Sequence, residues 1–162
     1  MNEARKMQLD WEGMFRRYIA DSTKTPYMVA VSRLNRAQAD YELFAYALFV
    51  SIIFGVLGVA AFSPSLPHGT STLVPLYAFS VVVAAIALGV LKHPAAAAYA
   101  ATGPVALLIY FVVYGFLPTH GPIEKTIMIA VVILWGRYSW RTVEIAKAYP
   151  SLPDPPAPKA QR

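Results

Sequence analysis

The chain has 162 residues, of which 57% are hydrophobic and only 14% are charged, and its formal net charge is +5. This composition excludes an ordinary soluble domain, in which about a quarter of the residues are charged. The absence of cysteine excludes disulfides, thiolate catalysis and zinc-thiolate sites.

The first 24 residues predict an amphipathic helix at a membrane surface. Apolar residues recur at helical spacing between Met7 and Tyr18, with arginines at the other positions. Such a face packs on lipid or on another protein surface, and periodicity favours neither. No apolar core typical of a cleavable signal peptide is present here. The residues expected to make these contacts are Trp11, Phe15, Tyr18, Arg16 and Arg17.

Residues 25–149 form the predicted membrane domain, which opens on Thr25 and Pro26. These two residues supply an N-cap and a first-turn proline, and nothing breaks the helical pattern before Phe62. We therefore expect one long helix whose first part, up to Glu42, projects from the membrane.

The sequence predicts an all-α integral membrane protein with four spans arranged as two helical hairpins. Residues 43–62 and 73–91 carry no charge and reach the roughly 20 residues that a hydrocarbon core requires. Residues 95–117 are also uncharged, but Gly103 and Pro104 predict a kink that frees the carbonyl near Ala100.

The fourth span, at about 123–140, has the weakest hydropathy. Only residues 126–136 are free of charge, so Lys125 and Arg137 must extend their side chains toward the interfaces. The aromatic residues Trp135, Tyr138 and Trp140 suit headgroup depth. A re-entrant or surface helix is the alternative.

Lysine and arginine counts predict the orientation. Seven lie before Glu42, one at Lys92 and five from Arg137 onward, whereas the two remaining connections carry none and one. Positive residues favour the cytoplasmic side, so both termini are expected there, in a bacterial-type inner membrane. The pattern requires an even number of spans. Residues 150–162 are rich in proline and predict a flexible tail.

Small residues at four-residue spacing predict the helix-packing faces. Such residues let helix backbones approach closely in lipid, either within the bundle or toward another subunit. The predicted packing residues are Ala47, Ser51, Gly55, Ala85 and Gly89.

Charged residues at the membrane boundaries are Glu42, Lys125, Arg137 and Arg141. Arg137, Arg141 and Glu144 are expected to form an exposed helical ion-pair cluster near lipid phosphate. His68, His120 and Glu124 are weak candidates for a zinc site, because two imidazoles and a carboxylate form an adequate ligand set. No other metal site and no cofactor is expected.

The function predicted from these features is a non-catalytic accessory or scaffold subunit of a larger membrane complex, not an enzyme. The spans offer few polar groups for an interior site, and known catalytic motifs are missing. Expected partners are anionic lipid headgroups and other membrane subunits, not nucleic acid. The alternatives are a small homo-oligomeric transporter or channel, with Glu42, Arg137 and Pro104 lining a passage, and a metal enzyme using His68 and His120.

Overall fold

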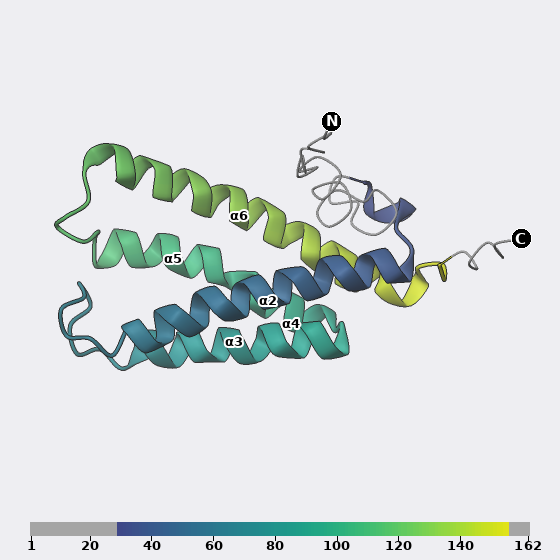
Figure 1. The fold of residues 1–162 in the computed structure, drawn as a ribbon, viewed down its shortest axis with the longest axis horizontal. Helices are drawn as coiled ribbons and strands as arrows, with labels where there is room; N and C mark the ends of the chain where they lie inside the picture. The colour runs from purple at the N-terminus through teal and green to yellow at the C-terminus, as the bar shows by residue number, and fades with distance from the viewer. Residues whose placement is uncertain (1–28, 156–162) are drawn as a thin grey trace, which may run out of the picture.

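The computed structural model describes residues 29–155, and this part of the chain is helical and contains no strand (Figure 1). The all-helical class predicted from the sequence is therefore confirmed. The predicted surface helix over residues 1–24 lies outside the described residues. The elements are η1 (Val31–Arg33), α2 (Arg36–Ala60), α3 (Leu73–Leu91), α4 (Pro94–Ala100), α5 (Thr102–Val113), α6 (Pro122–Ala148) and η2 (Tyr149–Ser151).

The long helices run side by side and share two ends (Figure 1). The start of α2, the α3–α4 turn and the end of α6 lie at one end, and the connections α2–α3 and α5–α6 lie at the other. We call these the terminal end and the loop end. At the terminal end α2, α3, α4 and α6 pack together, whereas α5 makes its main contacts with α6.

Three helical segments are long and apolar enough to cross a membrane. They are α2, α3 and the combined α4–α5 segment, residues Pro94–Val113. Large apolar side chains are exposed along all three, among them Ile52, Val83 and Val112. Contiguous apolar surface on this scale suits lipid rather than water.

The helix predicted to run unbroken from residue 26 is interrupted, because α2 begins only at Arg36. Asn35 and Gln38 form a capping box, in which Asn35 Oδ1 accepts from the Gln38 N–H at 2.9 Å. Gln38 Oε1 accepts from the Asn35 N–H at 3.0 Å. An asparagine side chain that bonds the backbone in this way favours a helix start over a helix interior. The expected stalk before Glu42 is thus a short η1 turn and a capped helix start.

The predicted kink in the third span appears as a break at Ala101, between α4 and α5. The Phe54 ring of α2 fills the space beside Gly103, where an added Cβ would lie 2.6 Å from the ring Cε2. Pro104, which cannot donate to the carbonyl of Ala100, is buried near Gly136 of α6. Glycine at position 103 is therefore required by a close approach between α2 and α5.

The small residues divide into two groups. Ala47 and Ala85 are buried, and a Cβ on Gly89 would lie 3.3 Å from that of Ala47, so these three positions are in the close α2–α3 contact. Ser51 is half-buried, and a Cβ on Gly55 would meet nothing within 4 Å.

The chain beyond α6 docks on the bundle as far as it is described. Leu152 is 6% exposed, and the Arg36 N–H donates to the Pro153 carbonyl at 2.9 Å. Residues 150–155, which the sequence assigned to a flexible tail, therefore pack against the start of α2. Residues 156–162 lie outside the described range.

Candidate functional site

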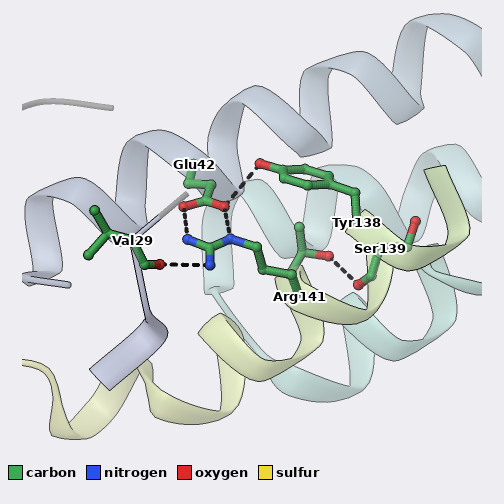
Figure 2. Close-up of polar contacts among 6 residues, drawn as sticks. Val29, Glu42, Tyr138, Ser139 and Arg141 are labelled. Carbon is green, nitrogen blue, oxygen red and sulfur yellow. Dashed lines mark hydrogen bonds and ion pairs between the residues drawn. The ribbon is translucent and has the colours of Figure 1, made fainter. Parts of the chain in front are cut away.

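A buried carboxylate at the terminal end carries the densest set of polar contacts among the described residues. Glu42 lies on the stripe of α2 that also buries Ala39, Leu43 and Tyr46, and it is 1% exposed. This stripe faces the last turns of α6, from which Tyr138 and Arg141 reach the carboxylate (Figure 2). We call Glu42, Tyr138, Arg141 and the Val29 carbonyl the Glu42 cluster.

The Arg141 guanidinium binds Glu42 through two bonds. Its Nε donates to Glu42 Oε1 at 2.7 Å, and its Nη2 donates to Oε2 at 3.1 Å. The Tyr138 hydroxyl donates to the same Oε1 at 3.0 Å. This fork geometry is specific to arginine and satisfies both carboxylate oxygens. Because both of its oxygens accept hydrogen bonds from α6, the Glu42 carboxylate anchors this helix to α2.

The same guanidinium reaches the N-terminal segment of the described chain. Arg141 Nη1 donates to the Val29 carbonyl at 2.8 Å, as Figure 2 shows. The first described residue is thereby held against α6, although 112 positions separate it from Arg141. The Glu42 cluster therefore fixes the direction from which the chain enters the bundle.

A second polar layer lies one turn from the Glu42 cluster, toward the loop end. The Tyr46 hydroxyl donates to Ser139 Oγ at 2.8 Å, and Ser139 Oγ donates to the Trp135 carbonyl at the same distance. Thr142 Oγ1 donates to the Ser139 carbonyl at 2.7 Å. These hydroxyls are buried and bonded to one another or to the helix backbone, as buried polar groups require.

Two further ion pairs lie at the terminal end. Arg36 pairs with Asp154 at 3.1 Å, and Lys92 pairs with Asp40 at 3.0 Å. The Tyr149 hydroxyl donates to Asp40 at 3.3 Å. Burial and the neighbouring Asp40 carboxylate raise the pKa of Tyr149, so it stays a neutral donor at physiological pH. These contacts join the α2 start, the α3–α4 turn and the chain after α6.

The remaining boundary charges do not join the Glu42 cluster. Arg137 is exposed on α6, and Arg141 bonds to Glu42 rather than forming the surface cluster expected with Arg137 and Glu144. Lys125 lies at the loop end, with Nζ 5.9 Å from the centre of the Phe116 ring. The predicted contact residues Trp11, Phe15, Arg16, Arg17 and Tyr18 lie outside the described range.

Of the two histidines at the loop end, His68 bonds to protein groups through both ring nitrogens. His68 is 7% exposed, and its Nε2 lies 2.9 Å from the Ala61 carbonyl, which can only accept. Its Nδ1 lies 2.9 Å from the Tyr110 hydroxyl. Glu124 caps α6 by accepting from the Gly121 N–H at 2.8 Å. Within residues 29–155 no group of three His, Asp or Glu side chains is arranged to hold a metal.

Sequence reasoning placed Glu42 and Arg141 at the same membrane boundary but missed that they pair. Their sequence signal is the acid that directly precedes the first span and one of the two arginines, Arg137 and Arg141, near the end of the last. Which arginine faces Glu42 depends on the rotation of α6, and neither composition nor spacing determines that rotation.

No protein-family model, curated protein or solved structure matches the chain. The Glu42 cluster and the apolar helices around it are therefore the basis for assigning a role.

Proposed function

We propose that the protein is a non-catalytic accessory or scaffold subunit of a larger membrane complex, held in a bacterial-type inner membrane by four spans. The observation that carries this proposal is the Glu42 cluster. A deeply buried carboxylate in a membrane helix often serves ion or proton transfer, but here Arg141 and Tyr138 occupy it. Its role is to fix the entry of the N-terminal segment, which is the action of a scaffold.

The length and position of α6 support its assignment as the fourth span. It has 27 residues, or about 40 Å at 1.5 Å per residue, against the roughly 30 Å of a hydrocarbon core. It also runs from the loop end to the terminal end, where it meets α2 (Figure 1). If α2 crosses the bilayer, a helix that joins the same two ends crosses it too.

The distribution of lysine and arginine supports a cytoplasmic terminal end. The regions up to Arg36 and from Arg137 onward hold twelve of the fourteen basic residues, and Lys92 lies in the α3–α4 turn at the same end. The loop end carries Lys125 alone. This asymmetry is the one that orients membrane proteins.

In this role the exposed apolar faces contact lipid and partner helices, and the N-terminal region provides the cytoplasmic contact. Helix association in lipid depends on close packing of small residues. Gly55 is such a residue on the outside of α2, with open space around it. It is available to a partner helix, whereas Ala47 and Gly89 are used within the bundle.

Native mass spectrometry after gentle detergent extraction tests the proposal. The tagged chain is expected in a complex whose mass includes other subunits. Arg141→Met, which releases the N-terminal segment, is expected to weaken that complex, whereas Arg137→Met on the exposed face is the matched control and leaves it intact. A chain that is always extracted alone, or as an integer multiple of its own mass, contradicts the role.

A small homo-oligomeric transporter is the alternative function, and liposome flux separates it from the scaffold. A passage built on Glu42 and Arg137 requires both side chains to face it, whereas Glu42 faces Arg141. Flux that disappears in Arg137→Gln and in Glu42→Gln would favour the transporter.

A further inference from the structure

An apolar groove with a volume of about 710 Å³ lies at the loop end of the bundle. It is bounded by the outer halves of α2 and α3 on one side and by α5 and α6 on the other, where α5 makes its main contacts with α6. Its wall is apolar over most of its length, with Ile53, Phe54, Leu107 and Val132 among the lining residues. The Glu42 cluster is not part of it.

The size and lining of the groove favour a slender apolar chain. A helix about 10 Å wide occupies about 1,200 Å³ over ten residues, so a groove of about 710 Å³ does not take in a whole helix of a partner or of a second copy. Ordered water needs two to four polar partners at each position. The wall offers few along its length, and the buried His120 Nδ1 and Trp135 Nε1, which have no partner within the described residues, lie toward its two ends.

The length of the groove suits a lipid tail. It reaches from the turn before α6 to Trp135, and Pro122 to Trp135 spans about 20 Å at 1.5 Å per residue. One leaflet of lipid chains fills about 15 Å, half of the hydrocarbon core. Ile127 and Val131 line the groove and are more than half exposed, so its rim is open to surrounding lipid.

Polar and cationic groups gather at one end of the groove, near the membrane surface. His120 lines it, and its Nδ1 is buried with no hydrogen-bond partner within the described residues. Lys125 lies over Phe116, another lining residue. The Glu124 carboxylate is also present, but it is bonded to the Gly121 N–H. A cation and an unpaired imidazole at the mouth of an apolar groove complement a phosphate attached to a hydrocarbon tail.

We propose that this groove binds one acyl chain of an anionic phospholipid, with the phosphate beside His120 and Lys125 and the chain end near Trp135. The proposal goes beyond the scaffold role and rests only on the membrane location of the apolar helices. Hydrocarbon gains little by moving from bilayer to protein, so selectivity comes from packing along the wall and from the headgroup contact.

Quenching of tryptophan fluorescence by brominated lipid tests this site. The chain contains three tryptophans, Trp11, Trp135 and Trp140. Two double variants, both carrying Trp11→Phe, each retain a single tryptophan as the reporter. Trp11→Phe with Trp140→Phe keeps Trp135 in the groove, and Trp11→Phe with Trp135→Phe keeps Trp140, which is 63% exposed and outside it. Each is reconstituted in phosphatidylcholine vesicles with a trace of phosphatidylglycerol brominated near the chain end.

We expect Trp135 to be quenched several-fold more than Trp140, and more by brominated phosphatidylglycerol than by brominated phosphatidylcholine at the same fraction. Ala106→Phe narrows the groove and is expected to remove the excess quenching of Trp135 over Trp140. Ala130→Phe, on the lipid-facing side of α6, is expected to preserve it. Val131→Phe on the rim is a second blocking variant should Ala106→Phe fail to fold. Lys125→Gln abolishes the preference for the anionic lipid.

Equal quenching of the two reporters overturns the proposal, as does excess quenching that persists in both blocking variants. Equal response to the two lipids overturns the headgroup assignment. Trp135 could also be shielded from quenching by the brominated lipid, with the shielding lost when the protein is diluted in the bilayer. That result would identify a second copy as the occupant and overturn the lipid site. None of these outcomes depends on the complex assigned above, so failure here is distinguishable from failure of the scaffold role.

Discussion

The Glu42 carboxylate and the Arg141 guanidinium meet through two bonds, although 99 positions separate them in the chain. The contact joins the start of the first long helix to the end of the last. A buried ion pair adds little net stability, because the cost of removing both charges from water offsets their attraction. Its value lies in geometry, since only one rotation of α6 brings Arg141 and Tyr138 to Glu42 together.

This pairing predicts strong coupling between the two residues. Arg141→Met leaves the Glu42 carboxylate buried without its cation and is expected to lower the free energy of unfolding by about 3 kcal/mol. The double variant Glu42→Leu/Arg141→Met removes both charges and is expected to recover most of that loss. Denaturation in detergent micelles measures both values.

Arg137→Met is the matched control, because Arg137 lies one turn earlier on the same helix and is exposed. A change within about 0.5 kcal/mol is expected for it. Additive effects of Glu42→Leu and Arg141→Met would show that the pair does not couple the helices.

The close approach of Phe54 to Gly103 predicts opposite effects for two glycine substitutions. Gly103→Ala would bring a methyl group into the Phe54 ring and is expected to destabilise the bundle by about 2 kcal/mol. Gly55→Ala, in a helix and in open space, is expected to stabilise it by about 0.5 kcal/mol or more. Thermal unfolding of the two variants measures the difference, and a shift of the same sign in both would argue against this packing.

Because the chain contains no cysteine, the four-span topology can be tested with single-cysteine variants. Ser65→Cys and Thr119→Cys at the loop end are expected to react with an impermeant maleimide in intact cells. His93→Cys and Ser151→Cys at the terminal end are expected to react only after the membrane is opened. All four positions are exposed in the structure, so accessibility reports sidedness. Labelling of Ser151→Cys but not of His93→Cys from outside would mean that only one of the two segments between these positions crosses the membrane.

Docking of Leu152 predicts that the C-terminal segment stabilises the start of α2. Leu152→Ala removes a buried side chain and is expected to cost about 2 kcal/mol and to speed hydrogen exchange at the Arg36 amide, which bonds to Pro153. Asp154→Asn disrupts only an exposed ion pair and is expected to cost less than about 1 kcal/mol. Unchanged exchange at Arg36 in Leu152→Ala would mean that the segment does not support this helix.

Hydropathy and turn residues were sufficient to predict the helices but not how they face one another. Charge-free runs gave α3 within its observed bounds, and Gly103 with Pro104 indicated the break between α4 and α5. The start of α2 was missed because Thr25 and Pro26 resemble a helix start. Asn35 and Gln38 carry the signal of the observed capping box.

The faces of the helices were less predictable, because the spans are apolar on all sides and small residues occur on several of them. Gly55 continues the spacing of Ala47 and Ser51 yet has open space around it, since the buried stripe of α2 passes instead through Val50, Phe54 and Gly58. The buried stripe has the same four-residue spacing as the small residues and is offset from them by one position, so spacing alone does not say which set faces the bundle. Rotation is set by the partner surface, which appears only in three dimensions.

The two backbone carbonyls held at the terminal end have a consequence for the path of the described chain. The Val29 carbonyl accepts from the Arg141 side chain, and the Pro153 carbonyl accepts from the Arg36 N–H. The first described segment is thus fastened to α6 and the last to α2, and the Glu42–Arg141 pair joins these two helices. A change in the angle between α2 and α6 would therefore redirect both segments at once.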